Sequence, residues 1–140
     1  MNKKTLPNDI LLGEVAALLR EGREAVIRPK GNSMLPFIRG DRDCVVLRLQ
    51  DGVEVGDIVL VHTGGRYLLH RVFSVDGRAL VLMGDGNIRG KESCTTDEVL
   101  GTVTEIIREN GRHRKPGRGR LWRALLPVRR YILAIYRRLI

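Results

Sequence analysis

Aromatic residues, cysteines and histidines are all scarce in this 140-residue chain. Aromatics make up 4% of it, so the core of a chain that is 43% hydrophobic must be built mainly from Leu, Val and Ile. The two cysteines, Cys44 and Cys94, form no CxxC pair, which argues against a disulfide framework or a cysteine-based zinc site. With only three histidines, at separate positions, we expect no metal and no cofactor.

The chain also lacks the long apolar segments that membrane insertion or export requires. No run of 18 apolar residues occurs, so no helix is predicted to span a bilayer. The N-terminal Met1-Asn2-Lys3-Lys4 is basic, but an acidic, interrupted segment follows it instead of the apolar stretch of a signal peptide. We therefore expect a protein on the cytoplasmic side of the membrane.

The net charge of +9 is concentrated near the C-terminus. Residues 1–107 hold 14 Lys/Arg and 15 Asp/Glu, whereas residues 108–140 hold 11 Lys/Arg and one acidic residue. Apolar residues and arginines interleave over 121–140 as in an amphipathic helix, and Pro127 is predicted to break it. Such a tail suits peripheral contact with an anionic membrane, or packing on the body or on a second subunit. Because the rest of the chain is nearly neutral, a nucleic-acid partner is disfavoured.

Periodicity divides the remainder into one helix and a set of short strands. Helical spacing of apolar residues predicts an amphipathic helix over 9–21. Runs rich in Val, Ile and Leu, separated by turn residues, predict strands at 24–28, 43–49, 57–62, 66–75, 78–83 and 99–107. The expected organisation is an N-terminal helix (1–23), a mostly β domain (24–109), a basic linker (110–120) and a basic helical tail (121–140).

Three short motifs supply the side chains that activate a serine nucleophile. They are Gly31-Asn32-Ser33-Met34-Leu35-Pro36, Leu69-His70-Arg71-Val72 and Gly84-Asp85-Gly86-Asn87. A serine hydroxyl needs a positioned base, and neutral histidine fills that role near pH 7. A carboxylate on the other ring nitrogen fixes the tautomer of the imidazole. Alone, each of Ser33, His70 and Asp85 has an ordinary explanation in a turn or strand, but together they favour peptide-bond hydrolysis.

With Gly56-Asp57-Ile58-Val59 and Val99-Leu100-Gly101-Thr102-Val103, these motifs resemble the signal peptidase and repressor-type self-cleaving protease superfamily. The likeness extends over about residues 24–107 and is strongest to the Ser-His signal peptidases of the endoplasmic reticulum and archaea. It implies a mainly β fold, like the catalytic core of those enzymes. It also implies Ser33 as the nucleophile, His70 as the general base and Asp85 as the orienting acid.

The resemblance further implies a polypeptide substrate, an extended precursor or leader peptide cut after a small residue. We expect such a peptide to add to an exposed strand edge near 24–28. Its contacts are then predicted from the serine turn and from that strand, namely Asn32, Met34, Pro36, Val26 and Ile27.

The chain departs from the family pattern at several positions. Gly31 stands where many relatives carry a serine that donates to the oxyanion, so the backbone N–H of Ser33 or the Asn32 amide would have to serve. The second acidic residue of the histidine type corresponds to Glu92 or Asp97, and spacing leaves both open. The alternative functions are a non-catalytic peptide-binding module and a self-cleaving regulator, the latter disfavoured because only 32 residues precede the serine.

Overall fold

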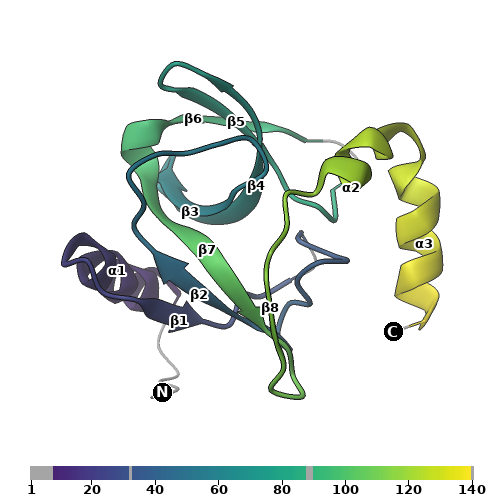
Figure 1. The fold of residues 1–140 in the computed structure, drawn as a ribbon, viewed down its shortest axis with the longest axis horizontal. Helices are drawn as coiled ribbons and strands as arrows, with labels where there is room; N and C mark the ends of the chain where they lie inside the picture. The colour runs from purple at the N-terminus through teal and green to yellow at the C-terminus, as the bar shows by residue number, and fades with distance from the viewer. Residues whose placement is uncertain (1–7, 32, 88–89, 140) are drawn as a thin grey trace.

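A computed structural model describes residues 8–31, 33–87 and 90–139 of the chain (Figure 1). The first element is helix α1 (Asn8–Arg20), which corresponds to the helix expected over 9–21. It ends at a turn in which the Gly22 amide donates to the Leu19 carbonyl. Gly22 has φ of 79°, a left-handed conformation that glycine adopts without strain and that commonly ends helices.

The body is one curved antiparallel sheet in which a late strand is inserted between two early ones. Its order is β1-β2-β7-β3-β4-β5-β6, so β1 lies at one edge, and β8 pairs with β7. The strands are β1 (Ala25–Ile27), β2 (Cys44–Arg48), β3 (Ile58–Thr63), β4 (Arg66–Asp76), β5 (Ala79–Met83), β6 (Glu92–Thr95), β7 (Val99–Ile107) and β8 (His113–Arg114).

The predicted fold class is confirmed: a mostly antiparallel β domain with an N-terminal helix and a helical C-terminus. Two short strands, β6 and β8, had no counterpart among the predicted ones. Strand β6 reads Glu-Ser-Cys-Thr, with Cys94 as its only buried residue, so it carries no apolar alternation. Strand β8 has two residues, both exposed, and lies inside the segment 110–120 that we expected to be a linker.

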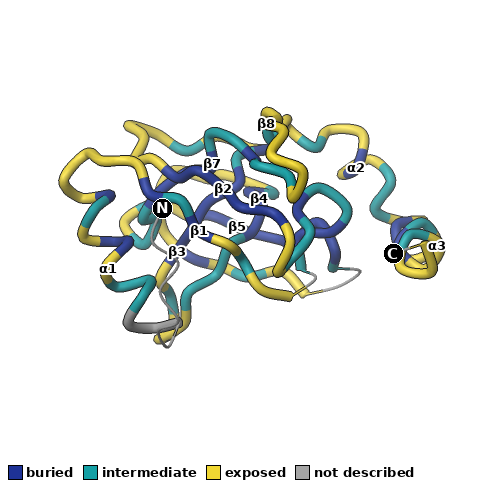
Figure 2. Tube along the Cα trace, turned by 90° about the horizontal axis from the view of Figure 1, so that it is seen from below, coloured by how far each residue is buried: buried dark blue, intermediate teal, exposed yellow. Residues whose placement is uncertain are grey.

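Two apolar clusters fill the body, and Figure 2 shows the buried stretches of the chain within the sheet. The larger one joins α1 to the sheet: Val15 and Leu19 pack with side chains from β1, β2, β3 and β7. The smaller one is formed by side chains of β3, β4, β5 and β6. As the composition requires, the buried side chains in both are almost all Val, Leu and Ile. The core therefore fixes the relative positions of α1, β1 and β4, which carry the residues considered next.

The C-terminal segment folds back onto the body as two helices. Helix α2 (Arg120–Ala124) and α3 (Arg129–Leu139) are separated by a 3-10 turn, Leu126–Val128, that contains Pro127. Trp122 and Leu133 are buried against Leu35 in a third apolar cluster. Among the described residues, no helix is both long and apolar enough to cross a membrane.

Candidate active site

Ser33 lies in the turn that follows β1, held mainly by main-chain contacts. The Gly86 amide donates a 2.7 Å hydrogen bond to the Ser33 carbonyl oxygen, which ties this turn to the Gly84–Asn87 loop. A Cβ on Gly84 would lie 2.3 Å from that same oxygen, so only glycine permits the approach. The loop expected to supply the acid of the site thus positions the serine through its backbone.

The loop after Ser33 has a second anchor at Asp43, whose side chain is fully buried. Its carboxylate accepts hydrogen bonds from the Arg39 amide at 2.8 Å and from Arg108 Nη1 at 2.7 Å. Burial opposes ionisation of this carboxyl, but the hydrogen bonds from Arg39 and Arg108 outweigh burial and lower its pKa. Asp43 therefore stays charged and closes the loop between Ser33 and β2.

His70 comes from the middle of β4, where it pairs with Val59 of β3. Its side chain is only 7% exposed, and its buried Nδ1 has no hydrogen-bond partner among the described residues. Burial lowers the pKa of His70 below its ordinary value, and the nearby Arg66 lowers it further, while Glu92 opposes the shift. The imidazole is therefore neutral at pH 7, the form that can accept a proton.

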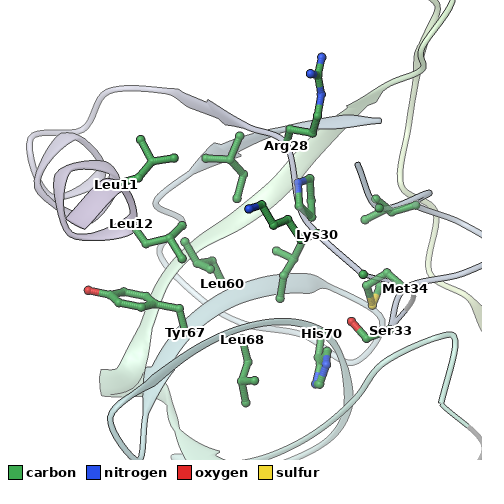
Figure 3. A pocket seen from close by; sticks show the side chains of 16 residues that line it. Leu11, Leu12, Arg28, Lys30, Ser33, Met34, Leu60, Tyr67, Leu68 and His70 are labelled. Atoms are coloured by element: carbon green, nitrogen blue, oxygen red, sulfur yellow. The ribbon is translucent and has the colours of Figure 1, made fainter. Parts of the chain in front are cut away.

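Ser33 and His70 line one pocket of about 220 Å³, although 36 residues separate them in the chain (Figure 3). Figure 3 labels both residues at the same end of the view, Ser33 on the turn after β1 and His70 on β4. Apolar side chains from α1, β3 and β4 form one part of the remaining wall: Leu11, Leu12, Leu60, Tyr67, Leu68 and Leu69. The nucleophile and base predicted from the sequence thus line the same pocket.

Asp85 has a different place from the one predicted. Its carboxylate forms a bidentate ion pair with Arg71, with distances of 2.8 and 2.9 Å from Nη2 and Nε. Arg71 Nη1 donates to the carbonyls of Gly56 and Gly117 at 2.8 and 2.9 Å. Both side chains of the pair are buried. The expectation that Asp85 orients His70 is not supported by this geometry, because the carboxylate oxygens bind Arg71 while His70 Nδ1 has no partner.

The two other acidic candidates are distinguished by their surroundings. Asp97 is largely exposed and forms an ion pair with Arg78. Glu92, on β6, bonds Arg66 at 3.5 Å and contributes a negative charge that acts on His70. Glu92 is therefore the acidic residue whose charge reaches the imidazole, and it does so without a hydrogen bond to Nδ1.

The predicted substrate-binding residues divide into three groups. Ile27 and Met34 line the pocket beside Ser33. Val26 and Pro36 do not line it, and Pro36 instead borders a second, basic pocket with Arg39 and Tyr136. Pro36 leaves the pocket because the chain turns after Met34, whose sulfur accepts a hydrogen bond from the Asp85 amide. Asn32 lies outside the described residues.

Sequence reasoning missed several residues of the site. The pocket wall from α1 was expected to be plain core packing, yet Leu11 and Leu12 face the pocket (Figure 3). The doublets Leu11-Leu12 and Leu18-Leu19 make the apolar stripe of the helix wider than core packing on one face requires. This width was the sequence signal for a second apolar surface. Lys30 brings a cation to the same wall. Arg71 was a second available signal: it is a charged residue inside an apolar strand, so it requires a buried partner of opposite charge, which the structure shows to be Asp85.

One curved antiparallel sheet thus carries a neutral histidine that lines the same pocket as a serine from the turn after the edge strand. The model of the Peptidase S24-like family matches residues 4–104. The chain therefore belongs to the Peptidase S24-like family, whose fold is that of serine peptidases and self-cleaving repressors. No curated protein matches the chain. Within the described residues, no cluster of three or more His, Cys, Asp or Glu is arranged to hold a metal ion.

Proposed function

We propose that this protein is a serine endopeptidase of the signal-peptidase-like type that cleaves an extended precursor or leader peptide. The observation that carries the proposal is the meeting of Ser33 and His70 at one pocket, from a turn and a strand distant in sequence. The lowered pKa of His70 supports it, because burial keeps the imidazole unprotonated and ready to act as a base.

In this mechanism, Ser33 Oγ attacks the scissile carbonyl carbon while His70 accepts the hydroxyl proton. The tetrahedral intermediate collapses, the C–N bond breaks, and His70 returns the proton to the leaving amine. Water, activated by His70, then hydrolyses the acyl-enzyme and frees Ser33. Main-chain N–H groups of the serine turn are the donors proposed for the oxyanion. Asp85 acts as a positioning residue. Its ion pair with Arg71 anchors the loop whose Gly86 amide donates a hydrogen bond to the Ser33 carbonyl.

The substrate would lie along β1 and place one side chain in the pocket. Strand β1 occupies the edge of the sheet, so an added strand can pair with its outer side. The residues that follow β1, from Arg28 to Gly31, continue directly into the pocket wall and the serine. A pocket of about 220 Å³ lined mainly by aliphatic groups exceeds the ~150 Å³ cavity that admits benzene. The pocket is therefore large enough for an apolar substrate side chain. The small residue that the family resemblance implies before the cleavage site would fill only part of it.

The test compares wild type, Ser33→Ala and His70→Ala on a set of peptides that vary at one position, with product masses read out. We expect cleavage by wild type and a loss of about 10³-fold or more in both variants. Ser74→Ala and His113→Ala are matched controls, because both residues are exposed and neither lines the pocket. Equal cleavage by all five proteins would end the proposal.

One observation favours a second candidate, a peptide-binding module without turnover. His70 Nδ1 has no carboxylate partner, and no hydrogen bond joins the Ser33 hydroxyl to the imidazole among the described residues. In such a module, the same peptides would bind wild type and Ser33→Ala with equal affinity and stay intact. Self-cleavage, the activity of the repressor-type relatives, is tested by the intact mass of the protein after incubation at alkaline pH.

A further inference from the structure

The outward side of α3 carries apolar side chains that the body does not cover. Tyr131, Ile135 and Leu139 are 60, 63 and 80% exposed, and Val128, just before the helix, is 43% exposed. Their spacing of three or four residues aligns them in one strip along the helix. We call these four residues the outer strip. Exposed apolar residues scattered singly need no explanation, but a continuous row does.

The outer strip is separate from the side of α3 that packs on the body. Arg129 and Leu133 are buried, and Tyr136 packs with Trp122 and Leu35 in the third apolar cluster. Arg129 donates to the carbonyls of Trp122 and Asn87, and Arg137 to that of Gly86. The helix is therefore held in place by one side alone, and the strip is exposed while the helix stays docked. Figure 2 shows both buried and exposed stretches along α3.

The charge around the outer strip is of one sign. The chain carries no acidic residue after Glu109, while Arg130 and Arg138 of α3 are the sequence neighbours of Tyr131 and Leu139. The Arg130 guanidinium lies 5.1 Å from the centre of the Tyr131 ring, directly beside the strip. Self-association through this surface would bring two strongly basic segments together, which costs electrostatic free energy. The surface instead matches a partner that is both apolar and negatively charged.

We propose that the outer strip of α3 binds the surface of an anionic membrane. Tyr131, Ile135 and Leu139 would enter the headgroup–acyl boundary, and the neighbouring arginines would bind lipid phosphates. Long arginine side chains can keep their stems along apolar surface while the guanidinium remains among the headgroups. The inference is independent of peptidase activity. Binding through the outer strip would hold the whole domain, including the Ser33 pocket, close to a lipid surface and to membrane-bound precursors.

The experiment sediments the full-length protein with sucrose-loaded vesicles. We expect strong pelleting with phosphatidylcholine mixed with phosphatidylglycerol, weak pelleting with phosphatidylcholine alone, and a decline as salt is raised. The triple variant Tyr131→Gln/Ile135→Gln/Leu139→Gln should lower the partition coefficient at least about tenfold. Glutamine keeps helix propensity and the charge unchanged.

The matched control changes three other exposed apolar residues, Leu49→Gln/Val55→Gln/Val75→Gln, which are 44, 39 and 37% exposed and lie outside the tail. This control should pellet like wild type, and emission from Trp122 of α2, which is buried against Leu35 of the body, should show that α2 stays docked in both variants. The proposal is overturned if the two triple variants pellet alike, or if wild type ignores anionic vesicles. It is also overturned if sedimentation equilibrium shows a dimer that only the tail variant loses.

Discussion

Asp85→Asn separates a catalytic from a structural role for the acid of the third motif. The side chain keeps its size, but the charge that balances Arg71 is lost. Asp85 is 2% and Arg71 6% exposed, and three hydrogen bonds of 2.8–3.1 Å join them. Leaving one member of such a buried pair unmatched costs about 3–5 kcal/mol. For a protein of this size, at about 3 °C per kcal/mol, the midpoint of thermal unfolding should fall by about 10–15 °C.

The assay is thermal and urea denaturation of wild type, Asp85→Asn and a control, Asp97→Asn. Asp97 also pairs with an arginine, but the side chains of Asp97 and Arg78 are 67 and 71% exposed. Its variant should therefore lose less than about 1 kcal/mol. A catalytic relay predicts the reverse for Asp85: near-normal stability and a rate reduced by about 10⁴-fold. That result would refute the structural assignment. Adding Arg71→Met to Asp85→Asn should recover part of the lost stability, because the Arg71 charge is then no longer buried without its partner.

Two further predictions concern the pocket. Because burial lowers the pKa of His70, the acid limb of kcat/KM should lie below pH ~6.5. Removing the opposing charge with Glu92→Gln should move that limb to lower pH, and Arg66→Gln should move it to higher pH. Shifts of the same sign in both variants would contradict this. Gly84→Ala would force its Cβ against the Ser33 carbonyl, so kcat/KM should fall by about 10²-fold, whereas Gly52→Ala, which meets open space, should be neutral. Equal rates for these two alanine variants would show that the loop does not position the nucleophile.

Much of the body could be predicted from the sequence because its strands are apolar and well separated. The long strand β4, expected at 66–75, spans Arg66–Asp76, and β7, expected at 99–107, has those same limits. Alternation and turn residues carry that information locally. Strand β8 could not be found this way, since two exposed residues form a strand only because β7 lies beside them.

The candidate site could be predicted in part, because two of its residues lie in local sequence motifs. Ser33 and His70 each lie in a local motif, and the fold brings both to one pocket. The partner of Asp85 depends on which buried cation lies nearest in three dimensions, and Arg71, adjacent to His70 in sequence, points its guanidinium to the opposite side of the strand from the imidazole. Spacing in the sequence does not show which face of β4 the Asp85 loop reaches, so it cannot distinguish His70 from Arg71 as the partner of Asp85. The role of the 110–120 segment was also hidden, since the Gly117 carbonyl contacts Arg71 only after the chain folds back.

The serine turn and the loop that supports it meet through main-chain atoms: the Ser33 carbonyl, the Gly86 amide and the bare Cα of Gly84. Atoms of this kind are common to every residue type, so substitutions at the pocket wall need not displace the hydroxyl. Variation in Leu11, Leu12 or Tyr67 can therefore alter which side chain is admitted without rebuilding the reactive centre. Substitutions in the pocket wall can therefore change the preferred substrate side chain, whereas position 84 must remain glycine for the serine turn to keep its place.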